Sequence, residues 1–542
     1  MKVTSRLLAD VTEPQFEAIT HLEGPLLVLA GAGSGKTRVI TRRICYLIER
    51  GVSPYNILAL TFTNKAADEM KERVLAYYNY PGLWVSTFHS MCARILRQEG
   101  NIERLGYTRN FSIYDTADTI GTIKTALKEL QLDPTHWKPS TLAVTISNAK
   151  NRLLNPEGML KERSDYYHQV ANKVYAKYQE LLMANNALDF DDLQLKLIEL
   201  LSKNPDVLDH YQEKFLFVLI DEYQDTNFAQ YLIQKLLSKK YRNICVTGDP
   251  DQSIYGWRGA NLGNILDFEK DYPDTKVVRL EQNYRSTKRI LQLASGLILY
   301  NKLRKTKGLW TENPEGNPIS VVHCEDERIE SREIAVRAME FHGKGKRYSD
   351  MAVFYRTNAQ SRVLEEAMRS YGIPYVIVSG VAFYQRREIK DVLSYLRLLV
   401  NPRDEVAFER IINTPPRGIG HTSVERLKAG ATSTDNNFIQ LASLGIEGIR
   451  GKAKEGLRAF SALYKGLNEM PRSPVRPLVT EVIAKTEYTA YLKSAFDPME
   501  VIERLANVDE LVNAAGEYDK MHPDGSLEDF LERVALVQDT DN

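Results

Sequence analysis

The segment AGAGSGKT, residues 30–37, combines three glycines with a lysine and a threonine at the spacing of a phosphate-binding loop. Its glycines would let backbone N–H groups turn inward around phosphates, Lys36 would reach the β- and γ-phosphates, and the Thr37 hydroxyl would hold Mg²⁺. The apolar run LLVLA (26–30) precedes the loop and a helical pattern (37–51) follows it, which is the context that such a loop requires. The alternative is a glycine-rich strand-to-helix turn without a ligand.

A phosphate-binding loop needs a metal-holding carboxylate at the tip of a neighbouring strand. The segment FLFVLIDEYQDTN (215–227) supplies it, because its apolar run ends in Asp221 and Glu222. Asp221 would bind Mg²⁺, directly or through water, and Glu222 would accept a proton from the attacking water or orient it. In isolation the same residues fit an acidic turn at a strand end. Gln15 is a further candidate, whose amide would read the adenine edge; a lone glutamine equally fits no ligand.

The segment VTGDPDQSIYGWRGA (246–260) follows a further apolar run and carries a different chemistry. Gln252 is placed to sense the γ-phosphate, because an amide can bond to it and shift after hydrolysis. Tyr255, Trp257 and Arg258 come next, and exposed aromatic side chains beside a cation suit the stacking of unpaired bases. The alternative is a pair of buried core aromatics, which the intervening glycine and the adjoining arginine disfavour.

Short apolar runs rich in Val, Ile and Leu alternate with helical patterns, and this predicts an α/β fold with a parallel sheet covered on both faces. The alternation lapses between about 114 and 187, where the pattern predicts helices only and indicates an insertion. A second alternation begins after 284, and from about 380 helices dominate. The predicted strands are LLVLA (26–30), ILALT (57–61), FLFVLI (215–220), NICVT (243–247), KVVRL (276–280), ISVVH (319–323), MAVFY (351–355) and PYVIV (374–378).

The composition is that of an ordinary globular protein, with 43% hydrophobic and 26% charged residues among 542. Lys+Arg and Asp+Glu balance at 71 each, so net charge neither favours nor excludes nucleic acid. The longest apolar runs are too short for a membrane span, and the N-terminus lacks the apolar core of a signal peptide. The four cysteines show no CxxC spacing, so neither a disulfide framework nor a zinc site is indicated. We expect several domains, a reducing cytoplasmic setting and no membrane partner.

A series of segments narrows the family. In order along the chain they are GAGSGKTRVI (31–40), LTFTNKAADEM (60–70), STFHSMCARIL (86–96), LIDEYQDTN (219–227), GDPDQSIYGWRGA (248–260) and LEQNYRS (280–286). Together they resemble the UvrD/Rep/PcrA-type superfamily 1 DNA helicases. The resemblance covers essentially the whole chain, because the second half also fits at VFYRTNAQSR (353–362), FYQRREIKDVLSYLRL (383–398) and TPPRGIG (414–420).

The resemblance implies a P-loop NTPase with two RecA-like parallel-sheet motor domains, each interrupted by a helical insertion. ATP would bind between the motor domains, and single-stranded DNA would cross their top. The first motor domain (1A) would comprise residues 1–113 and 188–283, its insertion (1B) residues 114–187, the first part of the second motor domain (2A) residues 284–379, and the second insertion (2B) residues 380–542.

The resemblance also assigns residues to ATP and Mg²⁺. Gln15 would read the adenine, Tyr284 would stack on it, and Arg285 would touch the γ-phosphate from the far side of the cleft. The predicted catalytic residues are Lys36, Asp221, Glu222, Gln252 and Arg285. The predicted metal ligands are Thr37 and Asp221. The predicted ATP-binding residues are Gln15, Ala32, Gly33, Ser34, Gly35, Lys36, Thr37, Arg38, Tyr284 and Arg285.

Side chains from both motor domains would face single-stranded DNA, by the same resemblance. Those that would contact unpaired bases or their backbone are Phe62, Tyr255, Trp257 and Arg258. Those on the phosphates are Asn64, Thr87 and His89. Arg356 and Asn358 match positions of the second motor domain that face the same strand.

Two further segments suit nucleic acid. TPPRGIGHTSVERL (414–427) is similar to the glycine turn of a helix–hairpin–helix, in which Gly418 and Gly420 would let backbone N–H groups meet a duplex phosphate near Thr422. A plain joint between two helices fits the residues alone as well, and the family context favours duplex contact. Residues 284–310 contain seven Lys/Arg and no acid, as a phosphate-backbone contact needs, although a solvated helix face has the same composition.

The implied function is an ATP-dependent DNA helicase that translocates on single-stranded DNA, 3′ to 5′, and separates strands at single-strand/duplex junctions. Repair or replication proteins of unknown identity would be its partners. The first alternative is an ATP- and single-stranded-DNA-binding module without unwinding. The second is the helicase part of a nuclease–helicase.

Two motifs of the family are not found in residues 287–542. One resembles H-S-x-K-G-L-E-F, and the other resembles R-R-L-x-Y-V-A-x-T-R-A, which supplies a second arginine to the γ-phosphate. We therefore expect an incomplete second motor domain and impaired activity in this chain, because such an arginine is worth several orders of magnitude in rate. GSLEDFLERVALVQDTDN (525–542), a helix capped by Ser526, would then end at a domain crossover.

Overall fold

Six parallel strands form the sheet that carries the phosphate-binding loop, in the order β3-β2-β6-β7-β1-β8. Every residue of β1, β2, β6 and β7 is buried, which confirms the predicted sheet with two covered faces. The strands are β1 (Leu26–Ala30), β2 (Ile57–Thr61), β3 (Trp84–Thr87), β6 (Phe217–Ile220), β7 (Ile244–Gly248) and β8 (Lys276–Leu280).

The computed structural model describes most of the chain. The described residues are 7–78, 82–303, 305, 307–377, 381–434, 438–445 and 448–540. Within them, the side chains of residues 258, 358, 381–382, 431–434 and 537–540 are outside the description.

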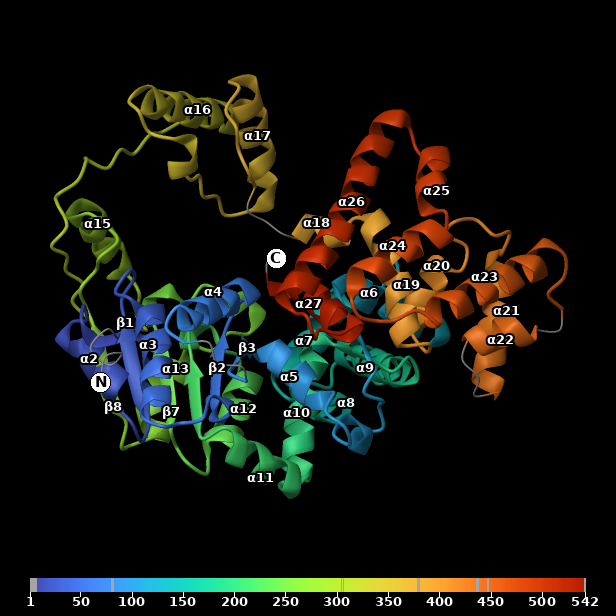
Figure 1. Ribbon diagram of the computed structural model, residues 1–542, viewed down its shortest axis with the longest axis horizontal. Coiled ribbons are helices and arrows are strands. Elements are labelled where there is room, and N and C mark those ends of the chain that lie inside the picture. Colours follow the sequence, from blue (N-terminus) through green and yellow to red (C-terminus); the bar gives the residue numbers. More distant parts are fainter. Residues whose placement is uncertain are drawn as a thin grey trace. The chain divides into compact units, whose positions relative to one another are not determined.

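Side chains of the sheet alternate between two separate cores. Leu27 and Leu29 of β1 enter one core, whereas Leu26 and Val28 enter the other. Helices cover both faces of the sheet and bury these side chains (Figure 1). Each buried Leu or Val stabilises the fold by about 1.5–3 kcal/mol. The helices of this part are α2 (Glu13–Thr20), α3 (Lys36–Glu49), α4 (Asn64–Leu75), α5 (Phe88–Leu96), α10 (Phe190–Lys203), α11 (Pro205–Lys214), α12 (Phe228–Ser238), α13 (Gly263–Leu266) and α14 (Phe268–Asp271).

The first insertion is helical, as predicted, and has a core of its own. The chain enters it through β4 (Ser112–Tyr114) and leaves it through β5 (Ala187–Asp189), and these two strands pair in parallel. We call this strand pair the insertion root. At the root the fully buried Lys150 lies 2.6 Å from Asp189 and 2.8 Å from Asp192. The helices are α6 (Thr116–Glu129), α7 (Pro139–Asn151), α8 (Pro156–Glu162) and α9 (Tyr166–Ala184).

The last part of the chain, from residue 381, is helical throughout its described elements and encloses another core. The Ser526 hydroxyl accepts a bond from the Asp529 amide at 3.1 Å, which confirms the predicted cap. The helices are α18 (Val381–Gln385), α19 (Arg387–Val400), α20 (Glu405–Ile411), α21 (His421–Thr434), α22 (Phe438–Leu444), α23 (Lys452–Asn468), α24 (Val475–Lys485), α25 (Tyr488–Ala495), α26 (Pro498–Met521) and α27 (Leu527–Thr540).

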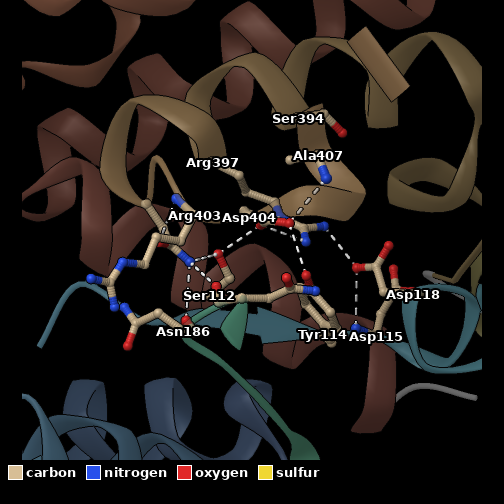
Figure 2. A network of polar contacts seen from close by, with 12 residues as sticks. Ser112, Tyr114, Asp115, Asp118, Asn186, Ser394, Arg397, Arg403, Asp404 and Ala407 are labelled. Atoms are coloured by element: carbon tan, nitrogen blue, oxygen red, sulfur yellow. Dashed lines mark hydrogen bonds and ion pairs between the residues drawn. The ribbon is translucent and has the colours of Figure 1, made fainter. Parts of the chain in front are cut away.

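A buried polar network joins this helical part to the insertion root (Figure 2). Asp404, fully buried, accepts hydrogen bonds from the hydroxyls of Ser112 at 2.6 Å and Tyr114 at 3.0 Å. Arg397 pairs with Asp404 at 2.8 Å and with Asp118 at 2.7 Å. Burying charges costs free energy unless they are paired, so the joint depends on all of these partners.

The joint holds both sides of the root. The Asn401 side-chain amide donates to the backbone carbonyls of Asn185 at 2.9 Å and Asn186 at 3.0 Å, just before β5. The same amide donates to Ser112 of β4 at 3.0 Å. Helix α27 adds a second contact, because Glu532 pairs with Arg97 at 2.6 Å.

A second compact unit comprises residues 286–297 and 311–379. Its helices include most of α15 (Lys288–Ile298), α16 (Glu327–Gly343) and α17 (Ser361–Ser370). Its core is small, with Ala335, Met368 and Ile373 as the buried members. The boundaries of the four domains expected from the sequence remain predictions.

The strands predicted in this second unit are wrong. Within the described residues, 319–323, 351–355 and 374–377 form no strand. Val321, with 95% of its surface exposed, and Phe354, with 93%, have no covering layer. An apolar run becomes a strand when a neighbour accepts its backbone hydrogen bonds, and none of these segments pairs with another described one.

Short 3₁₀ helices occupy several turns. They are η1 (Pro54–Asn56), η2 (Ile102–Leu105), η3 (Tyr223–Asp225), η4 (Pro250–Gln252), η5 (Gly256–Arg258), η6 (Tyr348–Asp350) and η7 (Asn358–Gln360). No helix in the described part of the chain has the length and apolar character needed to cross a bilayer.

We predict that Asp404→Ala destabilises the chain by about 3–5 kcal/mol, because Arg397 would lose a buried partner. The matched control is Glu409→Ala, since Glu409 pairs with Lys428 while 41% of its side chain is exposed. A pair this exposed is worth about 0–1 kcal/mol. Urea unfolding followed by circular dichroism measures both; equal losses would contradict the role of the joint.

Candidate nucleotide and DNA sites

The phosphate-binding loop lies between β1 and α3 and adopts the backbone that its glycines permit. Gly33 has φ 67° and Gly35 has φ 91°, both in the left-handed region. A Cβ on Gly33 would come within 2.9 Å of the Asn283 side chain, so a larger residue would collide with the segment after β8. The loop therefore has the compact turn that phosphate binding requires, as predicted from its sequence.

The predicted catalytic carboxylates meet this loop across the sheet. The Lys36 ammonium lies 2.6 Å from Glu222, and the Thr37 hydroxyl lies 3.3 Å from Asp221. Thr247 of β7 donates to Asp221 at 2.5 Å and fixes its orientation. Burial raises the pKa of the Asp221 carboxyl, and the charge of Glu222 raises it further. The hydroxyl of Thr37 and the carboxylate of Asp221 form the oxygen donor set that Mg²⁺ prefers.

Gln15 and the segment after β8 border the same loop. The Gln15 side chain is buried and donates to the Ser34 carbonyl at 3.1 Å. Asn283 donates from its side chain to the Ala32 carbonyl at 2.7 Å, and the Tyr284 amide donates to the Gly33 carbonyl at 3.0 Å.

These contacts bring the predicted adenine residues to the loop. The side chain of Tyr284 is half-exposed and available for stacking. Arg285 lies close to Gly33, because a Cβ added to Gly33 would come within 2.8 Å of the Arg285 Cβ. Arg38, also predicted on the nucleotide, pairs with Asp10 beyond the loop.

Gln224 links the two acidic segments and was missed from the sequence. Its amide nitrogen donates to Glu222 at 2.9 Å, and its amide oxygen accepts from the Asp249 amide at 2.9 Å. Gln252, the predicted γ-phosphate sensor, donates to the Asp249 carboxylate at 2.5 Å. Polar residues at the carboxyl ends of β6 and β7 were the signal that could have identified Gln224 and Thr247.

A groove of about 490 Å³ is lined by three of the four predicted base-contacting residues, Phe62, Tyr255 and Trp257. The rings of Phe62 and Tyr255 lie 4.6 Å apart, and the Trp257 side chain is 62% exposed. This confirms that the two aromatics of 246–260 are not both core residues. The insertion also lines the groove with polar side chains that the sequence had not indicated: Ser147, Asn148 and Asn151 of α7.

The predicted phosphate contacts lie beside this groove. His89 lines it and meets Gln194 at 2.7 Å. Thr87 is buried and caps α5, because its hydroxyl accepts from the Ser90 amide at 3.2 Å. Asn64 begins α4 and lines a neighbouring pocket. Thr87 would reach DNA only through a change in this cap.

The remaining predicted DNA residues do not line this groove in the described part of the structure. Gly418, with φ 73°, and Gly420 form the turn before α21, and Thr422 is exposed on that helix. Arg356 is exposed in the second unit. The side chains of Arg258 and Asn358 lie outside the described part of the structure.

The parallel sheet, the loop after β1 and the carboxylates after β6 define a P-loop NTPase of the RecA-like class. The family model described as UvrD/REP helicase N-terminal domain matches residues 11–273, and the UvrD-like helicase C-terminal domain model matches residues 278–542. The chain belongs to the UvrD/Rep helicase family, as the resemblance indicated, and its enzyme class is that of the helicases.

Relatives support the same assignment. Over 99% of its length the chain is 48% identical to the "ATP-dependent DNA helicase PcrA" of Bacillus subtilis (strain 168) and spans 73% of that protein. It is 46% identical to proteins of the same name from Staphylococcus epidermidis (strain ATCC 12228) and Staphylococcus aureus (strain NCTC 8325), and it spans 74% of each.

Asp225 in η3 provides a pH-dependent test of this region. Burial, and second the charge of Glu222, raises its pKa to about 6. Because the folded pKa exceeds the unfolded value of about 3.9, folding favours the neutral carboxyl. Its stabilisation is therefore present below pH 4 and is lost as the pH rises through 6.

We predict that Asp225→Asn raises the free energy of unfolding at pH 7.5 by about 2 kcal/mol relative to the parent chain, and by about half as much at pH 5. Urea titrations at the two pH values measure the difference. Asp267→Asn is the control, because 54% of the Asp267 side chain is exposed. A gain that is equal at both pH values would contradict the assigned cause.

Proposed function

We propose that this chain is the motor of an ATP-dependent DNA helicase, which uses ATP and Mg²⁺ and moves on single-stranded DNA. The observation that carries the proposal is the position of Gln252 and Tyr255 on one short segment. Gln252 belongs to η4 and bonds to Asp249. Gln224 connects Asp249 to Glu222, the partner of Lys36. Tyr255 packs against Phe62 in the groove. A change at the nucleotide can therefore alter the grip on a base.

The residues around the loop give the order of events. Lys36 is paired with Glu222 in this structure. When its ammonium turns to the β- and γ-phosphates, Glu222 is released to orient the attacking water and accept its proton. Mg²⁺ bound at Thr37 and Asp221 would neutralise charge on the phosphates.

The segment after β8 would contact the far side of the nucleotide. Tyr284 would stack on adenine, with Gln15 on the adenine edge. Arg285, next to the loop glycine Gly33, would meet the γ-phosphate. Loss of that phosphate would return Gln252 to Asp249, the partner that it has here.

The groove supplies the DNA contacts of the proposal. Unpaired bases would stack on Phe62, Tyr255 and Trp257, and the strand backbone would follow His89 and the polar wall of α7. The turn at Gly418 and Gly420 would contact the duplex at a junction. Movement from 3′ to 5′ is implied by the family resemblance.

A second candidate is a module that binds ATP and single-stranded DNA without unwinding. The exposed apolar segments of the second unit favour it, since Val321 and Phe354 lack a covering layer. Strand displacement on duplexes with a 3′ or a 5′ single-stranded tail separates the two candidates. Turnover without displacement supports the module, and displacement with the 3′ tail supports the helicase.

We predict that Lys36→Ala lowers DNA-stimulated ATP turnover by about 100-fold or more, because the phosphates lose their charged donor. Phosphate release in the presence of single-stranded DNA measures the rate. The matched control is Lys270→Ala, whose side chain is 79% exposed. Turnover that persists in the Lys36 variant would refute the nucleotide assignment.

We predict that Trp257→Ala weakens single-stranded DNA binding by about 1–3 kcal/mol, with little dependence on base sequence, because one stacking surface is lost. Fluorescence anisotropy with labelled oligonucleotides measures the affinity. Tyr166→Ala is the control, since this exposed aromatic lies on α9 of the insertion. An equal affinity for the Trp257 variant and the parent chain would exclude the groove as the base site.

A further inference from the structure

Lys307 is one of the seven basic residues of 284–310, but its side chain is buried and no role of its own is predicted for it from the sequence. Its ammonium pairs with the Asp249 carboxylate and lies 3.2 Å from Asp251. All three side chains are nearly excluded from solvent, at 5%, 2% and 7% exposure. A buried lysine between two carboxylates costs desolvation that a surface lysine avoids, so its position calls for a functional explanation.

The backbone around Lys307 is fixed against the edge of the phosphate-binding loop. The Gly308 amide donates to the Glu281 side chain at 2.9 Å, and the Trp310 amide donates to the Glu281 carbonyl at 3.1 Å. A side chain on Gly31 would overlap Leu309. The ammonium therefore approaches the carboxylates from a segment whose path is set by the sheet and the loop.

Asp249 is the point at which Lys307 meets the nucleotide machinery. The same carboxylate accepts the Gln252 side chain at 2.5 Å, and the Asp249 amide is bound by Gln224, which also holds Glu222. Glu222 in turn pairs with Lys36. A continuous polar chain thus runs from the loop lysine to Lys307.

We propose that Lys307 is a positioning residue for Gln252. Its ammonium stays with the Asp249 and Asp251 carboxylates in every nucleotide state. The amide of Gln252 can then leave Asp249 for the γ-phosphate without leaving a buried carboxylate unpaired, and it can return when the phosphate is lost. Lys307 thereby makes the exchange of partners by Gln252 reversible.

The charge balance supports this role. Without Lys307 the two carboxylates would stand close together in a buried site, near the negative charge of Glu222. Among the described side chains, the Gln252 amide would then be the remaining donor to the Asp249 carboxylate. Releasing Gln252 would leave that buried carboxylate without a side-chain donor, which costs free energy. Burial, and second the charge of Lys36, lowers the pKa of Lys307 to about 8. The two carboxylates at ion-pair distance favour the charged form. We take the ammonium as charged because both carboxylates lie within ion-pair distance.

The inference rests on the proposed function. A kinetic test uses ATP turnover, and an independent test uses hydrogen exchange. The variant is Lys307→Met, and the matched control is Lys305→Met, two residues away, which removes a surface pair with Glu269. Lys307→Arg should restore function because it keeps the charge.

We expect Lys307→Met to lower kcat about ten- to a hundredfold, with less than about a twofold change in KM for ATP, since the residue acts on positioning and not on nucleotide binding. In a Gln252→Ala background the same change should cause no further loss. A multiplied loss, or a rise in KM at constant kcat, would overturn the proposal, the latter in favour of direct phosphate contact.

Hydrogen exchange of peptides covering 246–256 decides the matter without turnover. Lys307→Met should raise the exchange of these peptides in the nucleotide-free chain, because the two carboxylates left without their shared cation repel each other. A non-hydrolysable ATP analogue should change the exchange far less than in the parent, because Gln252 stays with Asp249. Lys305→Met should match the parent in both states. Unchanged exchange in the Lys307 variant would overturn the inference.

The two failures are distinguishable. A parent chain without turnover refutes the proposed function while the exchange experiment still tests Lys307. If Lys307→Met does not fold, Asp251→Asn weakens the same contact without leaving an unpaired buried ammonium, and a smaller kcat loss with faster exchange is expected. Parent-like behaviour of Asp251→Asn would then overturn the role of the carboxylate pair.

Discussion

The parallel direction of β1, β6 and β7 is the constraint on which the chemistry of this chain depends. Parallel strands end at one edge of the sheet, so the loop after β1, the carboxylates after β6 and Thr247 at the end of β7 are brought together by the backbone. β7 lies between β1 and β6, which lets Thr247 hold Asp221 facing Thr37. Because this edge of the sheet is buried, an unpaired charge there costs free energy. The polar contacts therefore continue from the pair of Lys36 and Glu222 through Gln224 to Asp249.

This series of polar contacts explains how the proposed nucleotide and DNA contacts come to share one segment. Asp249 is bound by Gln224 from the β6 side and by Gln252 from its own turn. The next turn carries Tyr255 into the groove, against Phe62. The proposed coupling uses the shortness of this segment, because its buried hydrogen bonds connect Gln252 closely to Tyr255.

Local patterns predicted much of this. The turn at 30–37, the apolar strands of the first sheet and the helices between β4 and β5 depend on residues close in sequence, and the structure contains each of these elements. Thr247, Gln224 and Lys307 could not be predicted, because their partners are brought to them by the tertiary fold. The strands expected at 319–323 and 351–355 were wrong for a related reason: an apolar run records the tendency to extend but says nothing about whether a neighbour is present to pair with it.

The joint at the insertion root has a consequence for how this architecture can be recombined. Asn401 and Asp404 bind residues on both sides of the root, in β4 and just before β5. The residues that hold this joint together therefore lie in two segments nearly three hundred residues apart in the sequence. A chimaera that took residues 381–540 from one homologue and the insertion from another would have to inherit matching hydroxyls, carboxylates and amides at both places. The second helical part and the first insertion are therefore one matched structural pair, and exchanging either alone would leave buried polar groups without partners.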